Sequence, residues 1–188
     1  MKNAGTDGLQ EARRILVIGP GGSGKSTLAR RLGNILDLDV IHLDRFYWRP
    51  GWEEKPRKEW TGVVRRLIEQ EAWILDGNYG GTLDIRLEAA DAVIFLDFPR
   101  TLCIRRVMAR RLRHARRSRP DMAPGCPDRL TFKFLKYLWR YPVEQRPGIL
   151  EKLERRSDDK IVQILRSPEQ VHEFVAGLEG RKNISGKR

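Results

Sequence analysis

Residues 19–26 read Gly-Pro-Gly-Gly-Ser-Gly-Lys-Ser and match the phosphate-binding loop pattern G-x-x-x-x-G-K-[ST] at every fixed position. The apolar run from Ile15 to Ile18 precedes this loop and predicts a buried strand. Residues 27–36 follow it with leucine and isoleucine at helical spacing. Because a strand, a glycine-rich turn and a helix are the context that the pattern requires, we interpret the stretch as a working phosphate-binding loop rather than an ordinary turn.

The chemistry of this loop predicts ATP and Mg²⁺ as cofactors. Glycines let successive backbone N–H groups point at one anion, and the helix that follows adds its positive N-terminal end. We expect Lys25 to reach the β- and γ-phosphates and to act in catalysis, and Ser26 to offer its hydroxyl group to Mg²⁺. The residues expected to bind the nucleotide here are Gly19, Gly21, Gly22, Ser23, Gly24, Lys25, Ser26 and Thr27.

Composition is typical of one globular domain, because 40% of the 188 residues are apolar and 33% are charged. The sequence has no apolar stretch long enough to span a membrane and no signal-peptide core, so we expect a cytoplasmic protein without membrane contact. Only Cys103 and Cys126 are present, which excludes a disulfide framework and a four-cysteine zinc site. We expect a domain at 13–179 between a disordered lead-in at 1–12 and a basic tail at 180–188.

Segments with strand and helix patterns alternate along the chain. This alternation predicts an α/β three-layer sandwich with a five-stranded parallel sheet covered by helices on both faces. The expected strands are residues 14–18, 38–43, 73–75, 92–98 and 160–165. The expected helices after the first are residues 56–70, 83–90, 100–117, 129–140, 143–156 and 168–178.

Three of the expected strands end in aspartate, at Asp44, Asp76 and Asp97. The carboxyl ends of parallel strands share one edge of the sheet, where ligands bind, so we expect these carboxylates beside the phosphate-binding loop. We interpret Asp76 as a ligand of Mg²⁺, directly or through water, against the alternative of a turn cap. Asp44 is interpreted as the base or anchor for the acceptor group, against a helix cap or an ion pair. For Asp97 a structural and a functional role stay open.

Charge is concentrated in one expected helix. The formal net charge is +12, and no acidic residue occurs between Asp97 and Asp121. Phosphoryl transfer needs cations around the transferring group, so we expect Arg106 and Arg110 to hold phosphates and act in catalysis. A solvated basic face or a nucleic-acid contact is the alternative. The arginines of this region are at positions 100, 105, 106, 110, 111, 113, 116, 117 and 119.

An aromatic segment at 46–52 follows Asp44 and contains Phe-Tyr-Trp-Arg-Pro-Gly-Trp. Its rings are suited to stacking against a base or nucleoside, and equally to covering the core, and the sequence leaves both open.

These stretches resemble the adenylate-kinase-like small-molecule kinases and, more closely, the bacterial topology modulation proteins (FlaR-like). The resemblance covers about residues 14–178 and implies a P-loop kinase fold with a helical lid at about 113–128. The matching stretches are G-P-G-G-S-G-K-S-T-L-A-R at 19–30, H-L-D-R-F-Y-W-R-P-G-W at 42–52, D-G-N-Y-G-G-T-L-D-I-R at 76–86, F-L-D-F-P-R at 95–100 and R-P-D-M-A-P-G-C-P at 119–127.

The resemblance to adenylate kinases extends to single positions. It implies that Asp76 supports Mg²⁺, and that Arg106 and Arg110 match two arginines of those enzymes that contact adenine and phosphates. It implies further that Arg119, in the lid, closes on ATP, and that Arg166 lies in the loop beside the adenine.

Two positions of the chain depart from the adenylate-kinase pattern. Asn78-Tyr79-Gly80 replaces a Phe-Pro-Arg stretch, so a phosphate-binding arginine is missing and Arg86 is the candidate replacement. The segment around Asp44 is more similar to nucleoside-type kinases, in which the aspartate accepts a proton from a hydroxyl group.

The sequence leaves two main functions, and a third possibility is an ATP-binding protein with little catalysis. The chain lacks the N-K-x-D element of GTPases and is too short for a helicase core, which favours a kinase that transfers the γ-phosphate of ATP to a small acceptor such as a nucleoside, nucleotide or related metabolite. The alternative is a nucleic-acid-binding P-loop ATPase that affects DNA topology, with the basic helix contacting nucleic acid non-specifically. The aspartates at the sheet edge favour the kinase, since a simple binding protein has no use for them.

Overall fold

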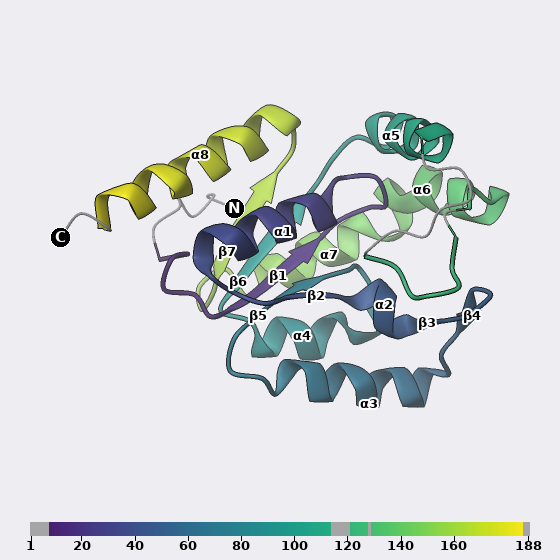
Figure 1. Ribbon diagram of the computed structural model, residues 1–188, viewed down its shortest axis with the longest axis horizontal. Coiled ribbons are helices and arrows are strands. Elements are labelled where there is room, and N and C mark those ends of the chain that lie inside the picture. The colour runs from purple at the N-terminus through teal and green to yellow at the C-terminus, as the bar shows by residue number, and fades with distance from the viewer. Residues whose placement is uncertain (1–7, 114–120, 128, 186–188) are drawn as a thin grey trace.

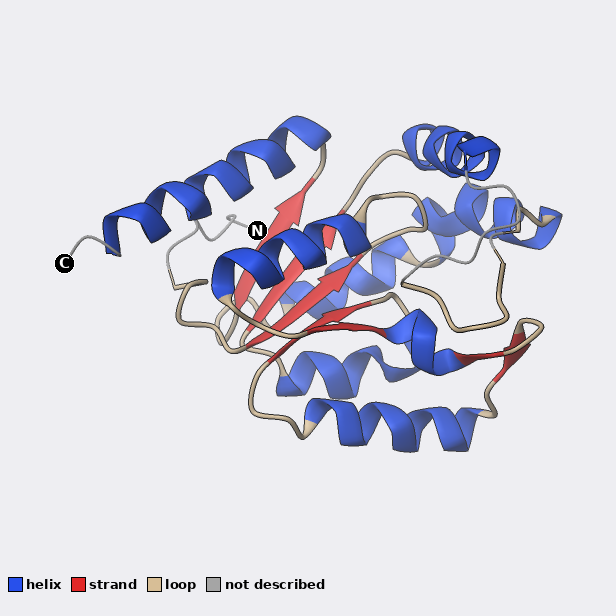
Figure 2. Cartoon of the chain, in the orientation of Figure 1, coloured by secondary structure: helices blue, strands red, loops and turns tan. Residues whose placement is uncertain are grey.

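A sheet of five parallel strands forms the centre of the computed structural model, which describes residues 8–113, 121–127 and 129–185 (Figures 1 and 2). The strand order is β2-β5-β1-β6-β7. Helices cover both faces, so the predicted three-layer α/β fold is confirmed. The strands are β1 (Arg14–Ile18), β2 (Val40–His42), β5 (Trp73–Asp76), β6 (Ala92–Leu96) and β7 (Ile161–Leu165).

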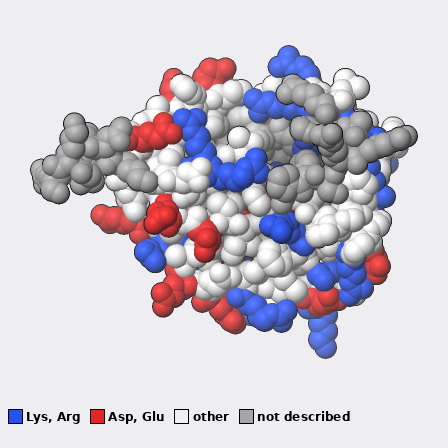
Figure 3. Space-filling view, viewed as in Figure 1, with Lys and Arg blue, Asp and Glu red and all other residues white. Residues whose placement is uncertain are grey.

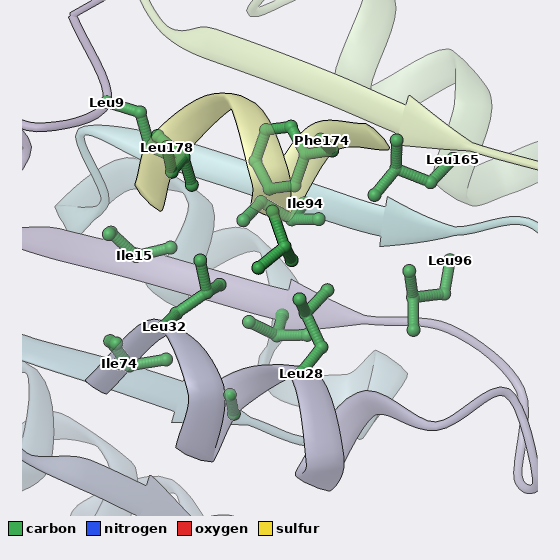
Figure 4. Packing of buried hydrophobic residues seen from close by; sticks show 14 of the residues in the cluster. Leu9, Ile15, Leu28, Leu32, Ile74, Ile94, Leu96, Leu165, Phe174 and Leu178 are labelled. Atoms are coloured by element: carbon green, nitrogen blue, oxygen red, sulfur yellow. The ribbon is translucent and has the colours of Figure 1, made fainter. Parts of the chain in front are cut away.

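Each face of the sheet has its own hydrophobic cluster. On one face, α1 (Lys25–Leu36) and α8 (Pro168–Ser185) bury leucine, valine and phenylalanine side chains against β1 and β6, as Figure 4 shows for Leu28, Leu32 and Phe174. On the other face, the helices are α3 (Arg57–Ile68), α4 (Leu83–Ala89) and α7 (Arg146–Glu154). The near-continuous burial of the strands is expected for a parallel sheet between two helical layers.

Two further helices, α5 (Arg100–Arg113) and α6 (Phe132–Glu144), pack against each other beyond the carboxyl edge of the sheet. The sequence predicts a helix boundary next to Pro142, but α6 continues through this proline and the break falls at Gln145. Thr131 begins α6 by accepting a hydrogen bond from the Phe134 backbone N–H. The side chain of Phe134 lies over the phosphate-binding loop, because a Cβ atom added to Gly21 would be 2.6 Å from its ring.

A short helix and a hairpin follow β2 where the sequence predicts a loop. These elements are α2 (Leu43–Tyr47) and the antiparallel strands β3 (Trp48–Arg49) and β4 (Glu53–Glu54). A 3₁₀ turn, η1 (Gly80–Thr82), lies between β5 and α4.

The two ends of the described chain differ from the sequence predictions. Leu9 is 1% exposed and packs in the core, so the expected disorder of residues 1–12 is wrong for 8–12, while 1–7 lie outside the described residues. The expected basic tail at 180–188 is helical in its first part, because α8 continues to Ser185, and residues 186–188 lie outside the described residues. At the N-terminal end, Leu9 and Ala12 pack in the core and order a segment that looks polar by itself.

Within the described ranges, no helix is long and apolar enough to cross a membrane.

Charged side chains are unevenly distributed over the surface. On the face drawn in Figure 3, acidic side chains lie mostly in the left half, whereas lysine and arginine side chains continue across the centre and right.

Candidate active site

A cavity of about 1030 Å³ opens at the carboxyl edge of the sheet, where the sequence predicts a ligand site. One wall is the phosphate-binding loop with the start of α1, and the opposite wall comes from α2, the hairpin and the turn after β5. Side chains from α5, α6 and residues 121–122 complete it. The expected residues that line it include Gly19, Gly21, Gly22, Gly24, Lys25, Ser26, Thr27, Asp44, Asp76, Arg106 and Arg110.

The conformation and packing of the phosphate-binding loop require glycine at several positions. Gly22 and Gly24 have φ angles of 82° and 96°, in the left-handed region that glycine tolerates best. A Cβ atom on Gly22 would also lie 2.5 Å from the backbone oxygen of Cys103, so the loop packs directly on α5. Lys25 points back along the loop and donates a hydrogen bond to the Pro20 carbonyl oxygen at 3.0 Å. We call this glycine-rich loop, with the Lys25 ammonium group beside it, the phosphate cradle.

The structure brings two of the predicted arginines to this cradle. The Arg106 guanidinium donates to the Ser23 carbonyl oxygen at 3.2 Å, and Arg110, one turn further along α5, also lines the cavity. Arg166 is not among the lining residues; its side chain lies 3.8 Å from Asp97. Arg119 lies outside the described residues.

Asp76 is buried at the end of β5 with its two carboxylate oxygens in different surroundings. Oδ2 lies 2.7 Å from Nδ1 of His42, whereas Oδ1 is buried without a hydrogen-bond partner among the described residues. An acceptor left in that state is destabilising unless a ligand or water satisfies it. Ser26 lines the same cavity as Asp76, so a hydroxyl group and a carboxylate lie beside the phosphate cradle. These hard oxygen donors fit a hydrated Mg²⁺ ion.

Asp44 lies on α2, across the cavity from the loop, and accepts a hydrogen bond from the Tyr79 hydroxyl group. Burial, together with the charge of Asp44, holds the pKa of Tyr79 far above its usual value. Tyr79 therefore remains a protonated donor and orients the carboxylate. Its φ of 26° is unusual for a residue other than glycine, which shows that the surroundings impose this position.

The suggestion that Arg86 replaces the missing phosphate-binding arginine is wrong. Its side chain is fully buried and donates hydrogen bonds to the carbonyl oxygens of Gly77, Asn78 and Tyr79 at 2.7–2.9 Å. Burial lowers the pKa of Arg86 to about 10. The guanidinium holds the turn after β5 from within the protein and does not line the cavity.

Asp97 takes the structural role that the sequence left open. Its two carboxylate oxygens accept hydrogen bonds from Arg146 at 2.7 and 2.9 Å, which joins the end of β6 to the start of α7. Such a bidentate ion pair fixes the orientation of the carboxylate relative to the guanidinium group as well as the distance between them.

The aromatic segment has the packing role that the sequence left open, whereas stacking against a base or nucleoside stays a prediction. Trp48 and Trp52 line the cavity and also pack on a small buried cluster of Met122, Ala123 and Cys126. Backbone and side-chain hydrogen bonds strengthen this contact: Gly51 N–H donates to the Gly125 carbonyl oxygen, and Trp52 Nε1 donates to that of Pro127, both at 3.1 Å. We call the contact between residues 48–54 and 121–127 the clasp.

Sequence reasoning missed three residues at this site: His42, Tyr79 and Phe134. His42 shows no metal-ligand spacing in the sequence, but in the structure it is the residue paired with Asp76 in the register of β2 and β5. Its place two residues before Asp44, on the same strand end, is the one signal that pointed to the site. Tyr79 and Phe134 reach the site only through tertiary packing, and no local pattern marks them.

Comparisons with known proteins agree with this geometry. No protein-family model matches the chain. A shikimate kinase of Vibrio cholerae serotype O1 is 31% identical over 134 residues, which are 63% of this chain and 74% of the relative. A shikimate kinase of Aliivibrio fischeri is 30% identical over 104 residues, 47% of this chain and 60% of that protein.

Solved structures show the same fold at low sequence identity. The shikimate kinase from Acinetobacter baumannii in complex with shikimate has a TM-score of 0.59 at 18% identity, covering 97% of this chain and 98% of that one. A gluconokinase from Sinorhizobium meliloti has a TM-score of 0.52 at 16% identity, covering 93% and 94%. These relatives are kinases of small molecules, and they give the nucleic-acid alternative no support.

Proposed function

The chain belongs to the shikimate kinase family of ATP-dependent P-loop kinases, and we propose that it phosphorylates a hydroxyl group of a small acceptor bound between Asp44 and the phosphate-binding loop. The observation that carries this proposal is that one cavity has an anion cradle on one wall and an oriented carboxylate on the other. The phosphate-binding loop would hold the phosphates of ATP, and bound ATP would supply the phosphoryl group that the acceptor hydroxyl takes, with ADP leaving.

Each side chain has a defined task in this scheme. Lys25 leaves the Pro20 carbonyl oxygen and binds the β- and γ-phosphates, while Asp44 orients the acceptor hydroxyl group and takes its proton. Ser26 and Asp76 would hold Mg²⁺, which would supply positive charge to offset that of the phosphates. Arg106 and Arg110 stabilise the negative charge that spreads over the transferring group.

Water must be excluded, because an open site would hydrolyse ATP instead of transferring its phosphate. We propose that the lid at about 113–128 closes over the nucleotide with Arg119, and that Arg166 lies beside the adenine. Residues 121–127 already rest on the hairpin through the clasp, which supports a lid that meets the acceptor wall.

Two acceptor classes lead the proposal. The relatives named above are shikimate kinases, so shikimate is the first candidate. The cavity wall beside Asp44 also presents the rings of Tyr47, Trp48 and Trp52, which are suited to a nucleoside or another flat molecule. Within the adenylate-kinase-like kinases we place the chain with the FlaR-like proteins, on the stretches at 42–52 and 76–86.

The test is ADP release from Mg-ATP in the presence of shikimate, gluconate, nucleosides and nucleoside monophosphates, with Lys25→Ala assayed in parallel. Stimulation by one of these compounds, lost in Lys25→Ala, supports the proposal and names the acceptor class. A slow release of ADP that no acceptor stimulates and that Lys25→Ala leaves unchanged contradicts it.

A further inference from the structure

We propose that His42 is a positioning residue for the metal-binding carboxylate: its imidazole fixes one oxygen of Asp76 so that the other faces the cation. The inference rests on the proposed function in one respect, namely that Asp76 holds Mg²⁺. His42 ends β2 and lies directly opposite Asp76 of β5 in the parallel register. Their side chains meet at 2.7 Å, and both residues are buried, with 8% and 5% of their surface exposed.

The chemistry of the pair assigns the proton. An ionised carboxylate can only accept hydrogen bonds, so Nδ1 of His42 is the nitrogen that carries the hydrogen and donates it. This hydrogen bond occupies Oδ2 and prevents the carboxylate from rotating about its last torsion angle. The orientation of Oδ1 is therefore set by the imidazole and not by the metal.

The second oxygen is then ready for a ligand. Oδ1 of Asp76 is buried and has no hydrogen-bond partner in the described part of the chain, although Asp76 lines the cavity together with Lys25 and Ser26. A buried oxygen in this state is satisfied when a cation or its bound water arrives. Residues that orient a metal ligand through the atom it does not use typically change metal affinity by about 10–100-fold when replaced.

Two matched substitutions test the inference. In His42→Asn the amide nitrogen lies close to the position of Nδ1 and keeps the donor, whereas in His42→Gln it lies near the position of Nε2 and leaves Asp76 without one. The measurement is the affinity for Mn²⁺ in the presence of ADP, from the electron paramagnetic resonance signal of free Mn²⁺. We expect His42→Gln to weaken Mn²⁺ binding by about 10-fold or more, and His42→Asn to remain within about threefold of the wild type.

Two controls separate positioning from folding. Affinity for ADP without metal should be the same in all three proteins, and thermal unfolding shows whether each variant is folded. In an Asp76→Asn background, His42→Gln should weaken Mn²⁺ binding no further, because both changes act on the same interaction. His42→Leu is the second donor-free variant and should behave like His42→Gln.

The outcomes are distinguishable. If His42→Gln and His42→Leu are folded and bind Mn²⁺ as tightly as the wild type, the inference is overturned while the proposed kinase function stands. If both donor-free variants and His42→Asn lose affinity equally, the hydrogen bond is not the cause and the inference is again overturned. If the wild-type protein itself binds no Mn²⁺ in the presence of ADP, the proposed metal site is wrong, and the inference that depends on it is overturned as well.

Discussion

The two halves of the cavity are built in opposite ways. The nucleotide half consists of one continuous stretch, in which β1, the glycine-rich loop and α1 follow each other within residues 14–36. The acceptor half combines α2, the hairpin, the turn after β5 and residues 121–122, which are far apart in the chain. The difference teaches that a phosphate site can be encoded locally, whereas the site that selects the acceptor depends on how distant segments pack.

The substitution with the largest expected effect tests the nucleotide half alone. Lys25→Ala removes the cation at the mouth of the cradle, so phosphoryl transfer should fall by at least about 10³-fold. The side chain is only partly buried and donates its hydrogen bond within the loop, to the Pro20 carbonyl oxygen, so the thermal unfolding midpoint should change little. Steady-state kinetics and circular dichroism measure the two quantities, and a large loss of stability would contradict the assignment of Lys25 to chemistry.

Asp44→Asn tests the acceptor half at its reacting group. The amide keeps the shape but cannot take a proton, so kcat should fall by about 10²–10³-fold while ADP affinity stays unchanged. Tyr79→Phe is the matched control, since it removes the donor to Asp44 and keeps the carboxylate, and its loss of kcat should be smaller. An Asp44→Asn enzyme with full kcat would remove Asp44 from the chemistry.

Arg86→Met tests whether the turn between the two halves depends on a buried cation. The change leaves the carbonyl oxygens of Gly77, Asn78 and Tyr79 without their donor, so the free energy of unfolding should drop by about 2–3 kcal/mol. Chemical denaturation measures this drop. If the variant is as stable as the wild type but loses ATP affinity selectively, Arg86 contacts phosphate after all.

Trp52→Phe gives the smallest expected effect and sharpens the description of the acceptor half. It removes the indole N–H that donates to Pro127 while keeping an aromatic ring, so stability should fall by about 1 kcal/mol. The KM for the acceptor should rise more than the KM for ATP, because Trp52 lines the acceptor wall. An equal rise in both constants would show that the clasp serves the whole cavity.

The sequence predicted the nucleotide half and the sheet because both depend on local patterns. Glycine spacing, apolar runs and strand-end aspartates located the loop, Asp76 and Asp44 correctly at one edge. It could not predict that Tyr79 orients Asp44, that Arg86 turns inward or that Arg146 binds Asp97. Each of these contacts depends on how α2, α4 and α7 pack on the sheet, and Asp97 and Arg146 are 49 residues apart in the chain.

The tryptophans of the clasp provide an intrinsic fluorescence signal for the contact between residues 48–54 and 121–127. Trp60 and Trp73 are buried in the core on one face of the sheet, where their surroundings do not include residues 121–127. Trp48 and Trp52 instead lie edge to face, with ring centroids 5.2 Å apart, against Met122 and Ala123. Any separation of residues 121–127 from the hairpin therefore increases the exposure of these two indoles to water and shifts their emission to longer wavelength, so that opening of the clasp can be followed by tryptophan fluorescence without an added dye.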